Sequence, residues 1–202
     1  MTVLGQRDWA PLFRPAPRDG DHGWLRFGDA LGVALYVSEE VANDLVRWAE
    51  QAMPEEAMGL LAGRPCEDAR APYTLVTGAV RAQHAEHSRV HVFAGVAEVA
   101  ELVADLRFGW PVAQMVGWWH VHPGYGTRYS RTDEETQEAL CAPSSVGLVI
   151  DPTRTELERI GAYLGPRSGR LWPQVPPEPP AASALPPLLA DLLNPLLGVH
   201  HA

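Results

Sequence analysis

Residues 115–152 read MVGWWHVHPGYGTRYSRTDEETQEALCAPSSVGLVIDP. The stretch starts with an apolar run that predicts a buried strand, and this run ends in a triplet that contains His120 and His122. A loop rich in proline and glycine follows, and Ser130 and Asp133 then open a predicted helix. Because alternate side chains of a strand share one face, we expect the two histidines to point the same way. Two imidazoles and a carboxylate are ligands that zinc takes in hydrolytic sites, so the stretch predicts a zinc hydrolase.

The composition is that of an ordinary globular domain with tails. The chain has 202 residues, of which 46% are hydrophobic and 20% are charged. Its 16 basic and 25 acidic residues give a formal charge of −9, which argues against general affinity for nucleic acid or for anionic membranes. Cys66 and Cys141 are too few for a disulfide framework. The N-terminus lacks the apolar core of a signal peptide, and no run of about 18 apolar residues predicts a membrane span. We therefore expect a cytoplasmic protein.

Apolar periodicity predicts a mixed α/β domain over residues 31–165. The predicted strands cover residues 32–37, 56–63, 73–80, 90–93, 114–122, 146–150 and 159–164, and the predicted helices cover 39–53, 95–107 and 131–140. Residues 1–30 are predicted to form an irregular arm. Residues 166–202 are predicted to be a proline-rich linker followed by a short apolar segment.

Each chemical feature also has an ordinary structural explanation when it is taken alone. The histidine pair suits a polar sheet face, the serine and aspartate suit a helix-capping pair, and Glu56 beside Glu55 suits a solvated helix end. Together the features are more specific, because they place hydrolytic groups on three segments next to predicted buried strands: Glu56, His120-x-His122 and Ser130-x-x-Asp133. Capping and ligation are also compatible, since the serine can cap the helix while the aspartate reaches a metal.

The pattern resembles the JAMM motif of the MPN+ (JAB) zinc metalloprotease family. That motif has a glutamate, a long gap, His-x-His, seven residues and Ser-x-x-Asp, and here residues 123–129 fill the seven-residue gap. The segments GWWHVHPGYG, DEETQ and VGLVIDP are similar to the deubiquitinase branch, which includes the catalytic subunits of the proteasome lid and the COP9 signalosome. Residues 56–63, EAMGLLAG, resemble the family's glutamate strand. The resemblance covers residues 32–165 and implies the mixed α/β MPN/JAB (cytidine-deaminase-like) fold, with a central mixed β-sheet flanked by helices.

The resemblance also implies a role for each motif residue. His120, His122 and Asp133 are expected to hold one catalytic Zn²⁺ ion. Glu56 is expected to act as the general base, and the Ser130 hydroxyl is expected to donate a hydrogen bond to the oxyanion.

The activity implied by the resemblance is cleavage of the amide bond after the C-terminal glycine of a ubiquitin-like protein. The composition suggests a bacterial conjugation pathway, with activating and conjugating enzymes as further partners. Residues 81–94 stand where the family carries the insertion that clasps the tail of the substrate. Two alternatives stay open, namely a peptidase that processes a sulfur-carrier β-grasp protein and a non-catalytic MPN scaffold.

Overall fold

The computed structural model describes residues 12–13, 16–17, 23–30, 32–69, 71–83, 86–87, 92–93, 96–111, 113–140, 142–156 and 158–174. The strands are β1 (Leu12–Phe13), β2 (Trp24–Asp29), β3 (Gly32–Ser38), β4 (Met58–Glu67), β5 (Pro72–Arg81), β6 (Glu86–His87), β7 (Val92–Phe93), β8 (Gln114–Val121), β9 (Val146–Ile150), β10 (Ile160–Leu164) and β11 (Gly169–Pro173). The helices are α1 (Glu39–Ala52), α2 (Val96–Gly109) and α3 (Arg131–Leu140). This content confirms the predicted mixed α/β class.

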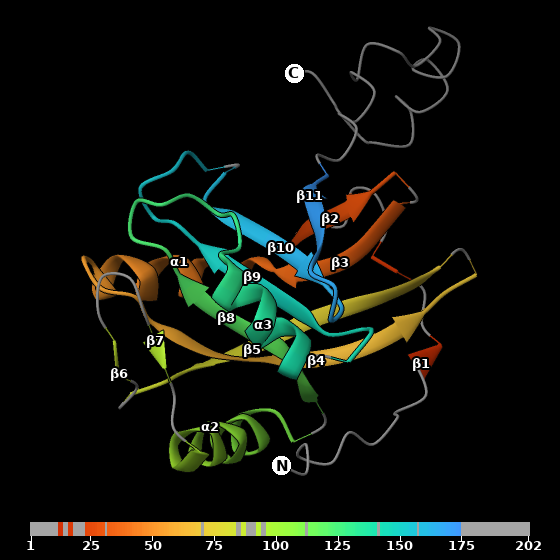
Figure 1. The fold of residues 1–202 in the computed structure, drawn as a ribbon. Helices are drawn as coiled ribbons and strands as arrows, with labels where there is room; N and C mark the ends of the chain where they lie inside the picture. The colour runs from red at the N-terminus through yellow and green to blue at the C-terminus, as the bar shows by residue number, and fades with distance from the viewer. Residues whose placement is uncertain are drawn as a thin grey trace, which may run out of the picture.

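One large mixed sheet organises the part of the chain that the structure describes (Figure 1). Its strand order is β1-β4-β5-β3-β2-β11-β10-β9-β8, and β4 also pairs with β8. The strands from β4 round to β8 therefore form a closed ring, while β1 pairs with the far end of β4. Strands β8 and β9 run parallel, and His120 lies opposite Val149. The carboxyl ends of β8 and β9 consequently meet at one edge of the domain.

Helix α1 supplies one side of the core. The Ser38 hydroxyl caps it by accepting a hydrogen bond from the Val41 amide at 3.3 Å. Leu45 is fully buried in the main hydrophobic cluster, which also contains Trp119 and Val121 of β8. The indole of Trp119 stacks on Trp48 of α1 with ring centroids 5.6 Å apart. Trp119 and Val121, the odd-numbered side chains at the end of β8, are therefore buried in the core beside α1.

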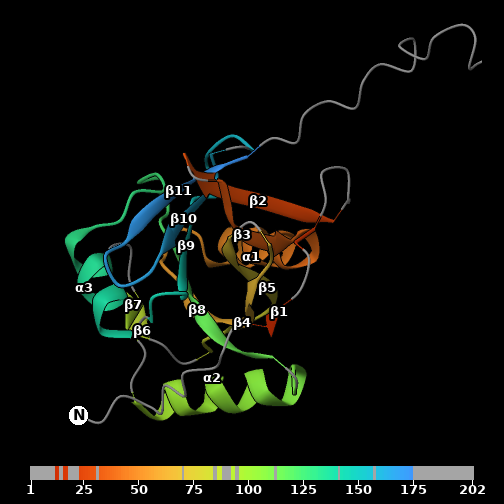
Figure 2. The ribbon, with the colours of Figure 1, turned by 90° about the vertical axis from the view of Figure 1, so that its right-hand side faces the viewer.

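The even-numbered side chains of β8 face the opposite way. Trp118 packs in a second cluster with Met58 and Leu60 of β4 and with Leu102 and Leu106 of α2. Figures 1 and 2 show α1 and α2 on opposite sides of β4 and β8. Since alternate strand residues share a face, His120 lies on the same side as Trp118. The alternation of side chains along β8 thus places Trp119 and Val121 in the core beside α1 and His120 on the opposite face.

Besides the two-residue strands β1 and β6, two longer strands lie where the sequence predicted irregular chain. Trp24–Asp29 form β2, which pairs antiparallel with β3, and Gly169–Pro173 form β11, which joins β10 to β2. The prediction of an irregular arm is therefore wrong for Trp24–Asp29, and the prediction of a linker is wrong for Gly169–Pro173. In β2 the buried Arg26 breaks the apolar alternation, and only Leu171 is buried in β11. Both segments form strands because their neighbours in the ring provide pairing partners.

The remaining predicted elements differ mainly at their ends. Strand β4 continues to Glu67, and residues 92–93 form β7, which pairs with β6 in a separate two-stranded sheet. The predicted apolar segment near the C-terminus lies outside the described residues, as do residues 1–11. None of the three helices that the structure describes combines the length and the apolar character that a membrane crossing requires.

Candidate metal centre

The backbone at the end of β8 is held on both sides. The Val121 amide donates to the Ala57 carbonyl at 2.8 Å, and the His122 amide donates to the Ile150 carbonyl at 2.9 Å. These bonds extend the pairing with β4 and β9 beyond the last strand residue. His120 and His122 are 1% and 7% exposed, respectively. Their imidazoles are therefore fixed in a buried position at the edge of the sheet.

Three metal-binding side chains meet at this position. His120 Nε2 and His122 Nε2 lie 3.0 Å apart. The carboxylate of Asp133, from the first turn of α3, approaches both rings, with Oδ1 3.1 Å from His120 Nε2 and Oδ2 3.4 Å from His122 Nε2. One potential ligand atom from each residue falls within 4.8 Å of the others. The fold thus brings together the three residues that the sequence predicted as ligands.

A reciprocal capping pair places Asp133. Its Oδ2 accepts a hydrogen bond from the Ser130 amide at 2.6 Å, and its own amide donates to Ser130 Oγ at 3.2 Å. This is the arrangement of a helix capping box, with an aspartate in the acidic position. The capping pair predicted from the sequence is therefore present, and the same carboxylate also reaches both histidines. Ser130 itself is exposed at the start of α3.

Glu56 lies immediately before β4, on the face that carries the histidines. Met58 is paired with His120, and the bond between Val121 and Ala57 continues this antiparallel register, so Glu56 falls opposite His122. The side chain is only 8% exposed. Burial raises the pKa of Glu56 from 4.5 to about 7, although the charge of His122 lowers it and that of Asp133 raises it. Glu56 is therefore a carboxyl group that gains or loses its proton near neutral pH.

Burial and the contacts between Asp133 and the two histidines determine the direction in which the pKa values of these three groups shift. Burial lowers the pKa of His120 even though its hydrogen bond to Asp133 favours the charged ring. Burial also acts to lower the pKa of His122, but the hydrogen bond and charge of Asp133 outweigh it and the pKa is raised. For Asp133, burial is outweighed by hydrogen bonds from both histidines, which hold its pKa well below the usual range. Asp133 is thus ionised while Glu56 is readily protonated, and such a divergence of neighbouring carboxyls suits acid–base chemistry.

The loop after β8 orients the imidazole of His122. His122 Nδ1 lies 3.0 Å from the carbonyl oxygen of Gly126, and a carbonyl can only accept, so Nδ1 carries a proton and Nε2 is the ring nitrogen that faces Asp133. The buried carboxylate of Asp151 holds this loop by accepting from the amides of Gly124 at 3.2 Å and Gly126 at 2.6 Å. Gly124 and Gly126 have φ angles of 92° and 80°, which glycine adopts readily. Asp151 therefore fixes the loop that orients His122, a candidate metal ligand, through backbone hydrogen bonds.

His120 is supported by a different set of contacts. Its ring stacks on the Trp118 indole, with centroids 4.6 Å apart and an interplanar angle of 7°. Trp118 Nε1 donates to Gln137 Oε1 at 2.6 Å, and the Tyr129 hydroxyl donates to the same oxygen at 3.1 Å. Gln137 is fully buried, and its Nε2 donates to the Gly165 carbonyl at 3.1 Å. This network ties α3 to β8 behind the site.

The sequence analysis missed Asp151, Trp118 and Gln137. A signal for Asp151 was present, because it directly follows a buried run and the carboxyl ends of parallel strands meet at one edge. Gln137 lies one helical turn after Asp133, on the same face of α3. Within residues 81–94, the predicted substrate insertion, the structure describes only residues 81–83 and the paired residues of β6 and β7.

Comparisons with known proteins agree with this geometry. Residues 38–163 match the family model of prokaryotic homologs of the JAB domain. The 26S proteasome regulatory subunit rpn11 of Schizosaccharomyces pombe is 29% identical over 125 residues, which are 60% of this chain and 39% of that protein. The ubiquitin carboxyl-terminal hydrolase RPN11 of Saccharomyces cerevisiae is 30% identical over the same coverage. The chain thus matches about two fifths of the length of these relatives.

A solved structure shares the fold. The solution structure of protein DSY2949 from Desulfitobacterium hafniense aligns with a TM-score of 0.52 at 24% identity, covering 68% of this chain and 88% of that one. The family match spans the strand–helix order from α1 to β10 and includes every residue of the metal centre. The chain therefore belongs to the family of prokaryotic homologues of the JAB domain.

Proposed function

We propose that this chain is a zinc-dependent peptidase that cleaves the amide bond after the C-terminal glycine of a ubiquitin-like protein. The observation that carries the proposal is the convergence of His120, His122 and Asp133 on one buried point, with Glu56 on the same face. Burying ionisable groups costs free energy, so we would not expect a purely structural site to bury two imidazoles and two carboxyls together.

The donor set fits zinc. Two ring nitrogens and one carboxylate form the mixed nitrogen and oxygen set of catalytic zinc sites, whereas calcium and magnesium favour oxygen ligands. His122 Nδ1 donates to the Gly126 carbonyl, so Nε2 is the ring nitrogen that is placed to bind a metal. His120 Nε2 lies 3.0 Å from His122 Nε2 and 3.1 Å from Asp133 Oδ1. A zinc ion bound by these atoms would replace the protons that link the imidazoles to the carboxylate.

In the proposed amide hydrolysis, zinc and the protein side chains have separate roles. A bound zinc ion lowers the pKa of water and polarises a carbonyl group. The Glu56 carboxylate takes the proton of the attacking water and passes it to the leaving amine. The exposed Ser130 hydroxyl donates a hydrogen bond to the developing oxyanion. The contacts of Asp151 and Gln137 hold the imidazoles in place during these steps.

The substrate class follows from the relatives and from the fold. One relative is named a ubiquitin carboxyl-terminal hydrolase, and it matches this chain over 125 residues. An extended glycine-ended tail can bind by adding a strand beside an exposed edge, which gives sequence-tolerant main-chain hydrogen bonds. The short β6–β7 pair is our candidate for that edge. In this proposal the tail belongs to a bacterial ubiquitin-like protein, whose activating and conjugating enzymes are further partners.

The geometry favours an enzyme over a scaffold. A non-catalytic MPN scaffold has no use for a complete set of metal-binding residues, and here the three residues converge. Processing of a sulfur-carrier protein would use the same mechanism and differ only in the substrate.

The test is hydrolysis of ubiquitin-like proteins that carry either a C-terminal peptide extension or an isopeptide-linked lysine. We expect the zinc-loaded chain to cleave after the terminal glycine and a chelator to abolish cleavage. Glu56→Gln should bind zinc normally but lose turnover, while Glu55→Gln, on the exposed neighbouring side chain, should remain active. Wild-type turnover by Glu56→Gln, or cleavage that survives the chelator, would contradict the proposal.

A further inference from the structure

A surface pocket lies directly behind the loop that holds His122. Its volume is about 420 Å³, and its walls come from the loop after β8, the turn between β9 and β10, and the strands β10 and β11. Gly126 lines this pocket, and its carbonyl oxygen accepts the Nδ1 proton of His122. The pocket is thus a separate site that shares one loop with the metal centre.

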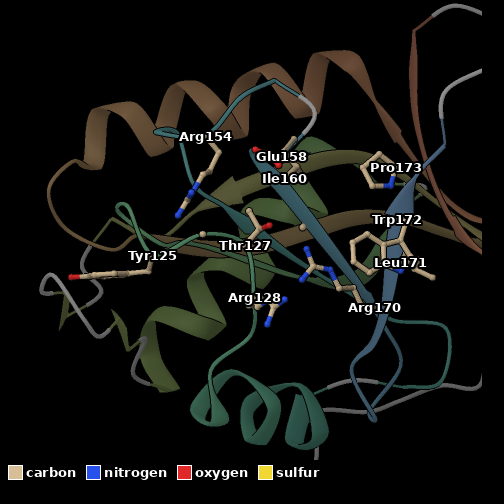
Figure 3. A pocket seen from close by; sticks show the side chains of 12 residues that line it. Tyr125, Thr127, Arg128, Arg154, Glu158, Ile160, Arg170, Leu171, Trp172 and Pro173 are labelled. Carbon is tan, nitrogen blue, oxygen red and sulfur yellow. The ribbon is translucent and has the colours of Figure 1, made fainter.

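Arginines dominate the charge of this pocket. Arg128, Arg154 and Arg170 line it against a single acidic residue, Glu158, although the whole chain carries a formal charge of −9. The Glu158 carboxylate already accepts a hydrogen bond from the Thr155 hydroxyl at 3.0 Å. In Figure 3 the three arginines stand around Thr127. This part of the surface is therefore locally positive on an acidic protein.

Two of these guanidinium groups lack an acidic partner. Arg154 pairs with Asp151 at 3.2 Å, but the side chains of Arg128 and Arg170 form no hydrogen bond or ion pair with any residue that the structure describes. Arg170 Nε is buried without a hydrogen-bond acceptor. Its guanidinium is held over the Trp172 ring, 4.5 Å from the centroid. A buried donor without an acceptor is costly, and an acceptor supplied by a ligand would satisfy it.

The ends of the pocket are aromatic. Tyr125 and Trp172 lie at its two ends in Figure 3, and they are 54% and 56% exposed. Arginine, tyrosine and tryptophan are the residues that carry most of the binding energy in protein interfaces. A guanidinium also matches the planar geometry of a carboxylate and can donate two parallel hydrogen bonds to it.

We propose that this pocket binds an acidic segment of a partner protein, whose carboxylates pair with Arg128 and Arg170 while its backbone or side chains pack on Tyr125 and Trp172. The binding requires no metal and is separate from the hydrolytic chemistry. A nucleic acid is the other polyanion that arginines and aromatic rings recognise, but the formal charge of −9 opposes a long polyanion that extends beyond the pocket more than a short acidic segment confined to it.

The experiment is fluorescence anisotropy of a labelled peptide with consecutive glutamates, titrated with the full-length chain without added metal. A peptide with glutamines in place of the glutamates and a single-stranded oligonucleotide of equal length serve as comparisons. We expect binding of the acidic peptide alone, weakened by salt. Arg128→Gln and Arg170→Gln should each weaken it about tenfold. Arg107→Gln, an exposed arginine of α2 outside the pocket, is the matched control and should leave binding unchanged.

Three results would overturn the proposal. The first is failure of the wild-type chain to bind the acidic peptide at low salt. The second is equal weakening by Arg128→Gln and Arg107→Gln, which would indicate general charge attraction. The third is tighter binding of the oligonucleotide, which would assign the pocket to nucleic acid. Arg128 is exposed, so its variant tests the pocket even where Arg170→Gln disturbs the packing on Trp172.

Discussion

Replacing Glu56 with glutamine is expected to stabilise the metal-free fold by an amount that depends on pH. Burial raises the pKa of Glu56 from 4.5 to about 7. Between these two values the unfolded chain has lost the proton that the folded chain still holds, so the stability of the parent chain falls as the pH rises. The glutamine variant has no proton to lose at this position. Its advantage over the parent chain therefore develops across this range and is complete above it.

The pKa change sets the size of this advantage. One pKa unit corresponds to about 1.4 kcal/mol, so a rise from 4.5 to about 7 gives ~3 kcal/mol in the free energy of unfolding once the pH exceeds 7. Glu56 is 8% exposed, so screening by solvent removes only a small part of this energy. The raised pKa that suits Glu56 to act as a base near neutral pH is therefore expected to lower the free energy of unfolding.

The assay is urea denaturation of the chelator-treated chain, with parent and variant compared near pH 4.5 and above pH 7. Glu55→Gln is the matched control, because it removes the same charge from an exposed neighbouring residue. We expect Glu56→Gln to gain stability at the higher pH, and we expect the control to show no such pH-dependent gain. An equal gain at both pH values, or a loss at the higher one, would refute burial as the cause of the raised pKa.

Three further substitutions test the surroundings of the site. Asp151→Asn should weaken zinc binding about tenfold in a competition titration, since the loop amides lose a carboxylate acceptor. Ser130→Ala should lose about 1 kcal/mol of stability together with about 100-fold in turnover, whereas Ser38→Ala, which removes the cap of α1, should lose stability alone. Gly147→Ala should cost about 2 kcal/mol by thermal denaturation, because its Cβ would overlap the Tyr129 hydroxyl. Equal turnover of Ser130→Ala and Ser38→Ala would show that Ser130 takes no part in the reaction. Wild-type zinc affinity of Asp151→Asn, or wild-type stability of Gly147→Ala, would contradict the contacts described for these two residues.

The sequence predicted the site better than it predicted the sheet. The alternation around His120 and His122 predicted that the two imidazoles share one face, and the structure brings them together while Val121 between them is buried in the core. The motif spacing also placed a capping pair at the start of α3, and this pair is formed. Such patterns are local, because they depend on strand and helix periodicity and on a capping residue that acts on the next turn.

Features that depend on distant parts of the chain were not predicted. Strands β2 and β11 form because the ring offers them partners, and neither has a clear apolar alternation of its own. The position of Asp151 directly after a buried strand was a signal, but its hydrogen bonds to the amides of Gly124 and Gly126 depend on how the loop after β8 folds. The arginine pocket combines side chains from three segments, which only the closed sheet brings together.

A calorimetric zinc titration of the chelator-treated chain addresses the assignment of His120, His122 and Asp133 as the metal ligands. We predict one zinc ion per chain for the wild type and no such binding for Asp133→Ala. Asp105→Ala, which removes an exposed aspartate from α2, should bind zinc as the wild type does. A wild-type chain that takes up no zinc, or an Asp133→Ala variant that binds one ion with unchanged affinity, would contradict the metal centre described above.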